Sequence, residues 1–300
     1  MTQNILIFLN SILIERLDAK AYEFVQKTQH EIQTQVTDAR FTALISLASR
    51  FIPKQLLRLT ETESARVKML IAGWNLDSWN TLDTARVSFI LARTDLLGST
   101  FADIFNQWFS YADEGELCAY YRAIPLLPEP QRLVWRAAEG CRTNMKTIFM
   151  AVACDSPFPC AYFDDVAWNQ LVVKALFTET PLVRVYGIDD RLSNELTHIV
   201  LDYMDERSSA GRDIPVDAWL CIGKTNDVRF DKAVNIALQS SSLKQQAAAI
   251  VALGRAQRRH ILHSFLANNS DRYMQNVVQE VLNGKITQTN FHELVSQFEG

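Results

Sequence analysis

The chain has 300 residues, of which 48% are hydrophobic, enough to bury the core of one large domain or two modest ones. Such a composition indicates a globular protein and excludes an intrinsically disordered one. Because 34 acidic residues outnumber 30 Lys and Arg, the net charge is −4, and the sequence offers no basic field for nucleic acid.

An apolar run from Ile5 to Ile14 predicts an amphipathic helix at the start of the chain. Asn10 and Ser11 interrupt the run and no basic residue precedes it, so it does not resemble a secretory signal. It is also shorter than the roughly 20 residues that span a bilayer. We expect one face to pack on the next helix, the alternative being peripheral contact with a membrane or partner. That face consists of Ile5, Phe8, Leu9, Ile12 and Leu13.

The middle of the chain contains residues that typically start and stop helices. Thr60 and Glu63, three residues apart, predict a capping box. The next amphipathic segment predicts a helix that stops at Gly98. Two short helices should follow, the second opened by Asp113 and closed before Pro125.

From residue 130 onward, apolar residues recur at three and four positions, and the helices come in pairs with short loops. The pairs are 130–138 with 141–153, 163–177 with 189–207, 214–222 with 227–238, 243–254 with 257–267, and 271–282 with 288–298. We therefore predict an all-α fold, an α-solenoid of stacked helical hairpins similar to HEAT repeats. The proline cluster from Leu126 to Pro130 predicts a hinge, with an N-terminal helical region over 1–128 and a helical-repeat region over 129–300. The alternative is one continuous domain.

The residue types that carry familiar chemistry are sparse. Five cysteines form no CxxC pair, which favours reduced thiols in a cytoplasmic protein. His260 and His263 lack neighbouring ligands, so we predict no metal site. The sequence contains no P-loop, GxGxxG, GxSxG or HExxH motif, so we expect no cofactor and favour a protein without catalytic activity.

A polar patch accompanies the predicted helix over 139–153. At 100 degrees per residue, Glu139, Arg142, Thr143 and Lys146 fall on one side of that helix. One interpretation is a solvated face on which Glu139 and Arg142 pair. The other is a groove in which this face meets polar residues of the helix over 163–177.

The helix over 163–177 opens with Asp164 and Asp165, which suit a helix N-terminus. Asn169 is less expected in so apolar a segment. We predict that it is buried and hydrogen-bonded to the loop at 154–161, and that one of the two aspartates caps the helix. Trp168 either packs in the core or lines an apolar pocket.

Four segments resemble the EboA family of bacterial proteins: EGCRTNMKTIF, SPFPCAYFDDVAWNQLVVKALF, PLVRVYGIDDRLSNELTHIVLDYMDER and AGRDIPVDAWLCIG. The likeness covers about 139–223. It implies a helical protein encoded beside a UbiA-type membrane prenyltransferase, a dehydroquinate-synthase-like protein and hydrolase-like proteins. The resemblance assigns no catalytic role to the shared residues, which are Arg142, Asn144, Asp164, Trp168, Asn169, Gln170, Asp190, Arg191, Glu206 and Arg207.

Together these features predict a non-catalytic helical-repeat scaffold or adaptor for an Ebo-type pathway of metabolite biosynthesis or export, with other Ebo-cluster proteins as partners. The alternative is a small-molecule binding protein or enzyme with a polar cleft between helices 139–153 and 163–177. The candidate ligand or partner site comprises Glu139, Arg142, Asn144, Lys146, Asp164, Asp165, Trp168, Asn169, Gln170, Lys174, Asp190 and Arg191.

Overall fold

The computed structural model describes residues 1–34, 36–284 and 287–297. Over these ranges the chain is helical and forms no strand, which confirms the all-α prediction; Leu56 and Asn80 form an isolated bridge. The chain divides into two compact units, Met1–Ala167 and Trp168–Gly300. The proline-rich segment 126–130 lies within the first unit, and the predicted division after residue 128 stays a prediction.

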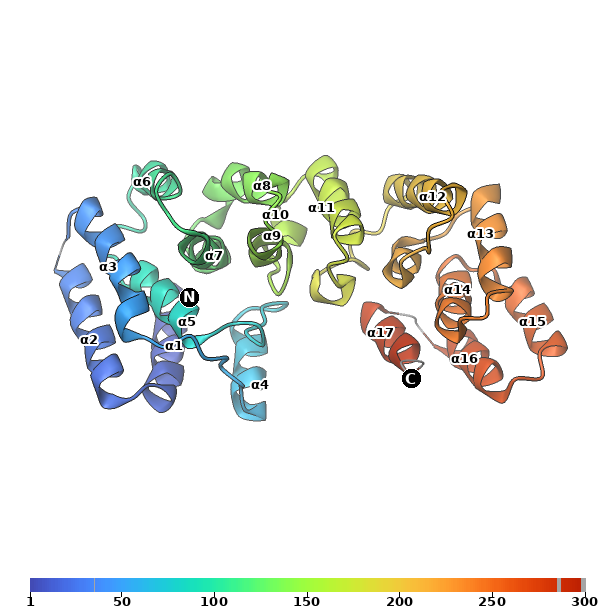
Figure 1. The fold of residues 1–300 in the computed structure, drawn as a ribbon, viewed down its shortest axis with the longest axis horizontal. Coiled ribbons are helices and arrows are strands. Elements are labelled where there is room, and N and C mark those ends of the chain that lie inside the picture. Colours follow the sequence, from blue (N-terminus) through green and yellow to red (C-terminus); the bar gives the residue numbers. More distant parts are fainter. Residues whose placement is uncertain (35, 285–286, 298–300) are drawn as a thin grey trace. The chain divides into compact units, whose positions relative to one another are not determined.

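The first unit contains ten α-helices and two 3₁₀ helices within its described residues, coloured blue to green in Figure 1. They are α1 (Thr2–Arg16), α2 (Ala19–Gln33), α3 (Asp38–Phe51), α4 (Glu61–Leu70), α5 (Thr81–Leu91), α6 (Phe101–Trp108), α7 (Glu114–Ala123), η1 (Ile124–Leu126), η2 (Pro130–Leu133), α8 (Val134–Arg142), α9 (Lys146–Ala153) and α10 (Phe158–Tyr162). Helix α11 (Asp165–Phe177) crosses the division between the units.

The core of the first unit is built around α5, which contacts α1, α2, α3 and α7 (Figure 1). All 11 of its residues are buried. The predicted apolar face of α1 is confirmed, because Ile5, Phe8, Leu9, Ile12 and Leu13 are at most 2% exposed. Asn10 interrupts that face for a structural reason: its side-chain amide exchanges hydrogen bonds of 2.8 and 3.0 Å with that of Gln29 on α2.

Two predicted helix starts in this unit are confirmed. Thr60 and Glu63 form a capping box at α4, and Asp113 and Glu116 form one at α7. The predicted stop at Gly98 is wrong, since α5 ends at Leu91. Just beyond it, the Arg93 guanidinium pairs with Asp38 at 3.0 Å and with Asp95 at 2.6 Å, and it lies over two aromatic rings. These long-range contacts hold the chain in a turn where local propensity would continue the helix.

The second unit contains six further α-helices and two 3₁₀ helices within its described residues. Helix α14 is central in this unit and contacts α13, η4, α15, α16 and α17. Residues 247–253 of α14 are all buried. Beyond the end of α11, the elements are η3 (Leu182–Arg184), α12 (Asn194–Ser209), η4 (Val216–Cys221), α13 (Val228–Leu238), α14 (Leu243–Arg255), α15 (Arg259–Asn268), α16 (Arg272–Asn283) and α17 (Gln288–Ser296).

Helices α13 to α17 begin and end within a few residues of the predicted bounds, although the last predicted residue, 298, lies outside the described ranges. The helix predicted over 189–207 starts later, at Asn194, because Ser193 caps it. Asp189 instead lies in the preceding turn, where it pairs with Arg255 at 2.8 Å. The helix predicted over 214–222 is the 3₁₀ helix η4.

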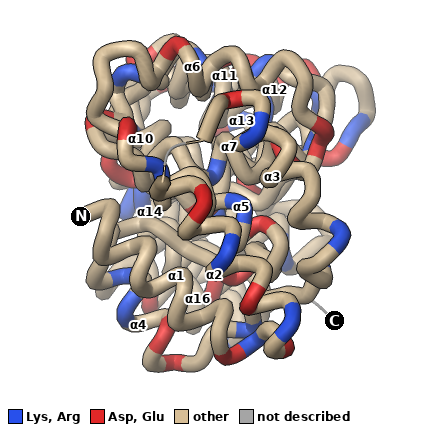
Figure 2. Tube along the Cα trace, turned by 90° about the vertical axis from the view of Figure 1, so that its left-hand side faces the viewer, with Lys and Arg blue, Asp and Glu red and all other residues tan. Residues whose placement is uncertain are grey.

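The distribution of charged residues and the hydropathy of the helices agree with the composition of the sequence. Acidic and basic positions are interspersed along the chain in Figure 2, in keeping with the net charge of −4. None of the helices in the described ranges combines the length and the hydropathy that crossing a bilayer requires. Burial raises the pKa of the Cys118 thiol to about 11.

Candidate functional site

The predicted polar face over 139–153 does not exist as one helix. Helix α8 ends at Arg142 and α9 begins at Lys146, with an extended break between them. The hydroxyl of Thr143 accepts a hydrogen bond from the backbone N–H of Met145 at 3.2 Å, a local bond that competes with helix formation. The prediction of a continuous helix is therefore wrong.

The side chains of this segment are exposed, which favours a solvated face on which Glu139 and Arg142 pair over a groove. The Arg142 guanidinium donates to the Glu139 carboxylate, and the two side chains are 61% and 38% exposed. Asn144 and Lys146 are exposed as well. An ion pair in this setting contributes at most about 1 kcal/mol to stability.

Some polar residues of the motif on α11 are exposed to solvent and others are buried in the core. Asp164 caps the helix by accepting from the backbone N–H of Ala167 at 2.7 Å, as predicted. Asp165 and Gln170 are exposed and Lys174 is half-buried. Asp164 thus has a clear structural role at the start of the motif.

Trp168 and Asn169 of α11 are buried, at 1% and 4% exposure, and each side chain carries an N–H group. The predicted burial of Asn169 is confirmed. The predicted hydrogen bonding is wrong for its amide nitrogen, because Nδ2 has no hydrogen-bond partner among the described residues, and neither has Trp168 Nε1. The Arg191 guanidinium lies over the Trp168 ring at 5.3 Å, so the fold brings these two predicted site residues together.

The remaining motif residues lie on or near α12. Asp190 is exposed in the turn before this helix, and Glu206 is exposed near its end. The Arg207 Nε donates to the carbonyl of Asp213 at 2.6 Å, which fixes the chain after the helix. The predicted cleft between 139–153 and 163–177 would draw on both units, and it stays a prediction.

A cavity of about 330 Å³ lies within the second unit, at a place the sequence did not indicate. Its apolar lining includes Leu176 at the end of α11 and Phe291 and Val295 on α17. Its charged lining includes Glu179 after α11 and Lys244 near the start of α14. The volume is at the lower end of the roughly 300–1,000 Å³ typical of small-molecule sites.

Two sets of hydrogen bonds hold the walls of this cavity. Asp217 of η4, which also lines it, accepts from the backbone N–H of Leu182 at 2.7 Å. On α17, the Gln288 side chain donates to the carbonyls of Leu182 and Val185 at 2.5 and 2.9 Å. The backbone N–H of Gln288 donates to Asp189 at 2.7 Å. These long-range contacts explain why no local pattern predicts the cavity.

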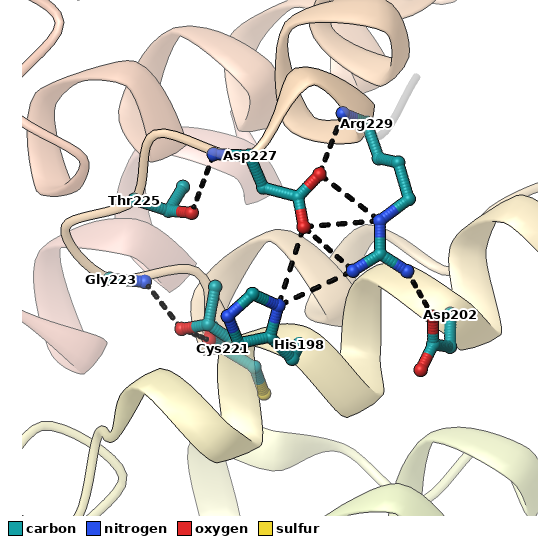
Figure 3. Close-up of polar contacts among 8 residues, drawn as sticks. His198, Asp202, Cys221, Gly223, Thr225, Asp227 and Arg229 are labelled. Atoms are coloured by element: carbon teal, nitrogen blue, oxygen red, sulfur yellow. Dashed lines mark hydrogen bonds and ion pairs between the residues drawn. The ribbon is translucent and has the colours of Figure 1, made fainter.

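A cluster of charged side chains joins α12 to α13 (Figure 3). Asp227 caps α13 through the backbone N–H of Arg229 at 2.9 Å and receives the Arg229 guanidinium at 2.7 Å. Arg229 also reaches Asp202, and its second terminal nitrogen lies 3.3 Å from Nδ1 of His198 (Figure 3). The bonds from the Arg229 side chain and backbone lower the pKa of Asp227 to about 2. We interpret this cluster as a staple between two helices.

Sequence reasoning also missed buried charges in the first unit. Asp83 and Arg86 lie on α5, where Asp83 pairs with Arg122 and Arg86 lies 3.7 Å from Glu116. Arg86 Nε also donates to the carbonyl of Ile45 at 3.1 Å. The available signal was weak: apolar residues occur on every side of α5, so no face of this helix suits solvent. Both partners lie on α7, far away in the sequence, and nothing local predicts the pairing.

The family comparison covers most of these elements. A family model described as metabolite traffic protein EboA matches residues 5–223, a wider span than the predicted 139–223. No curated protein and no solved structure matches the chain. The match includes Glu179 and Asp217 of the cavity wall and ends before α13, so Lys244 and α17 lie beyond it. Because the model matches well over half of the sequence, this chain belongs to the EboA family of metabolite traffic proteins.

Proposed function

We propose that this chain is a non-catalytic scaffold or adaptor in metabolite traffic, which holds proteins of an Ebo-type pathway together. The family description supplies the broader role. The proposed adaptor role is supported by the arrangement of the helices and by the structural contacts that the polar side chains make.

The contact pattern of the helices carries the proposal. In the first unit, α5 packs against α7 and α7 against α9; in the second, α14 packs against α16. Contacts between every second helix are typical of stacked helical hairpins, which bury one face of each pair and present extended surfaces to partners. This pattern supports a HEAT-like solenoid within each unit.

The polar residues of the family motif support the same role. Asp164 caps a helix, Arg142 pairs with Glu139, and Arg207 bonds to a backbone carbonyl. These groups maintain the fold and leave other exposed residues of α11, such as Val166 and Gln170, as candidates for partner contact. The proposed partners are the proteins that the family resemblance implies are encoded nearby, including a UbiA-type membrane prenyltransferase, with the chain acting in the cytoplasm or against the membrane.

Crosslinking and co-purification with these neighbouring proteins test the proposal. We expect the native chain to recover at least one of them, and the double variant Val166→Asp/Gln170→Arg to recover less. Tyr273→Asp is the matched control, because Tyr273 is 73% exposed on α16, outside the family match. If no neighbouring protein is recovered even after crosslinking, the adaptor role is wrong.

The cavity in the second unit favours a second candidate function, the binding of a small molecule. The two roles are compatible, because a traffic adaptor that also binds the transported metabolite would place it beside its partner enzymes.

A further inference from the structure

We propose that the segment from Arg50 to Met69, called the basic segment from here on, docks this chain on the surface of an anionic bilayer. It comprises the end of α3, the connection that follows and most of α4. The inference deepens the proposed action against a membrane and rests on the proposed function only for that setting. Its support comes from the charge of the segment, from the ion pairs it forms and from its exposed apolar side chains.

The basic segment has the opposite charge from the whole chain. Between residues 50 and 69 there are five basic and two acidic residues, a net charge of +3, whereas the whole chain carries −4. All five basic residues are exposed: Arg50, Lys54, Arg58, Arg66 and Lys68. Such a local excess attracts an anionic surface, and each Lys or Arg that reaches an anionic bilayer strengthens binding about fivefold.

Ion pairs do not neutralise these cations within the described part of the chain. The ion pair that the basic segment forms there joins Glu63 to Arg16 of α1 at 2.6 Å, so this carboxylate is compensated from outside the segment. Glu61 lies in the first turn of α4, where a carboxylate stabilises the helix N-terminus. Other exposed cations of the first unit behave differently, since Lys27 and Arg40 each pair with a glutamate. The cations of the basic segment are therefore able to interact with an external anion.

Exposed apolar side chains lie among these cations. Phe51, Leu56 and Met69 are 40%, 59% and 87% exposed, and each has a lysine or arginine within two residues of it. Segments that bind membranes peripherally combine these two kinds of side chain, because apolar groups enter the boundary of the acyl chains while cations contact the headgroups. An anionic bilayer offers both environments in one surface, which favours it as the occupant over an acidic protein surface.

Buried residues and long-range contacts hold the basic segment on the first unit. Three of its apolar residues are only 2% exposed: Ile52, Leu57 and Val67. Arg16 donates to the carbonyl of Leu57 at 2.7 Å and to Glu63 at 2.6 Å, so one side chain joins the connection to α4. Helix α4 lies beside α1 (Figure 1), and the Arg66 guanidinium lies 5.5 Å from the centre of the Phe8 ring. Because these contacts already fix the backbone, docking does not have to order it, which lowers the entropic cost of binding.

Vesicle co-sedimentation of the full-length chain tests the charge match. The two preparations are phosphatidylcholine alone and phosphatidylcholine with about 30% phosphatidylglycerol. We expect binding to the anionic vesicles to be at least about tenfold stronger than to the neutral ones, and this advantage to disappear at about 0.5 M NaCl because salt screens the charges. Equal binding to both preparations, or no saturable binding to the anionic vesicles at low salt, would overturn the proposal.

Charge-reversal variants assign the binding to the basic segment. Lys54→Glu/Lys68→Glu should weaken binding to the anionic vesicles by at least about tenfold. The matched control, Lys224→Glu/Arg272→Glu, reverses two exposed charges outside the segment and should bind like the parent. Circular dichroism and thermal melting check that each variant is folded. If both double variants lose binding equally, the vesicles respond to net charge and the assignment is wrong.

An apolar double variant separates entry into the bilayer from attraction by charge alone. Leu56→Ser/Met69→Ser keeps every charge and removes two exposed apolar side chains. It should bind the anionic vesicles about tenfold more weakly, because less apolar surface leaves water on docking. A folded variant that binds like the parent would show that these side chains stay outside the bilayer, which contradicts the proposed docking.

An acidic protein surface is the other occupant that the charge would suit. If the parent binds no vesicles but Lys54→Glu/Lys68→Glu lowers the recovery of a neighbouring Ebo protein, the basic segment is a protein contact and the bilayer proposal is wrong. The adaptor role would stand in that case. Vesicle binding with no partner recovered would give the opposite result, so the two failures are distinguishable.

Discussion

The two units differ in the kind of side chain that their central helices bury. Each has a central helix surrounded by others, α5 in the first unit and α14 in the second. Helix α5 buries charged and hydroxyl side chains that bond to specific partners, whereas the buried stretch of α14 is AAAIVAL. The first unit therefore depends on exact pairing, and the second on the close approach that small side chains allow.

The comparison predicts which kind of substitution destabilises each unit most. A buried ion pair adds little net stability, but removing one partner leaves a costly uncompensated charge. An alanine-rich interface has no such charge and is sensitive instead to added volume. In the second unit the strongly paired charges of Asp227 and Arg229 lie near the surface, where solvent weakens them.

The largest expected effect comes from breaking a buried pair on α5. Arg86→Met leaves the carboxylate of Glu116 buried and unpaired, because Arg86 and Glu116 are 3% and 7% exposed. We expect a loss of about 3–5 kcal/mol in the free energy of unfolding, measured by urea denaturation. The double variant Arg86→Met/Glu116→Gln keeps the capping-box geometry without the charge and should recover most of the loss. Equal stability of Arg86→Met and wild type would contradict the comparison.

Added volume in α14 should have the next largest effect. Ala249 is 0% exposed, and Ala249→Leu must displace neighbouring helices. We expect a loss of about 1–3 kcal/mol, again from urea denaturation. Ala267→Leu is the matched control on an exposed position of α15 and should be within about 0.5 kcal/mol of wild type. Equal losses in both variants would mean that α14 is not packed as closely as the structure indicates.

The surface charges of the second unit should give a smaller, pH-dependent effect. The pKa of Asp227 is lowered from 3.8 to about 2, so its carboxylate stabilises the fold above pH 3.8. This stability is lost as the pH falls from about 4 towards 2, because the unfolded state then binds the proton more readily. In Asp227→Asn the contribution should be absent, so thermal melting curves of variant and wild type should converge near pH 2. A gap that is constant from pH 6 to about 2 would argue against this origin.

The smallest expected effect concerns Asn169 on α11. Because its amide Nδ2 is buried without a hydrogen-bond partner among the described residues, the leucine variant Asn169→Leu removes an unsatisfied group at similar volume. We expect a free energy of unfolding no lower than that of wild type, since replacing unpaired buried polar atoms is nearly neutral or stabilising. Asn169→Ala, which leaves a cavity, provides the contrast and should be the less stable variant. A large loss in the leucine variant would show that Asn169 has a polar partner after all.

Helix starts were the part of the fold that local sequence determined best. Thr60 and Glu63 form the capping box that their spacing predicts, because a capping box involves only residues three apart, and α7 starts after Asp113 as predicted. The apolar face of α1 was equally predictable, since a period of 3.6 residues is a local property. The all-α fold and the family followed from the same kinds of pattern, repeated along the chain.

Helix ends and sites depended on residues far apart in the sequence. Helix α5 ends at Leu91 and not at Gly98, because Arg93, just beyond Leu91, binds Asp38 on another helix. The buried carboxylates of Asp83 and Glu116 likewise pair with arginines from other helices. The cavity takes its walls from segments more than 100 residues apart, between Leu176 and Phe291. Local patterns report helix periodicity and caps, whereas the energy of a buried charge or a cavity wall depends on partners that only the folded chain brings near.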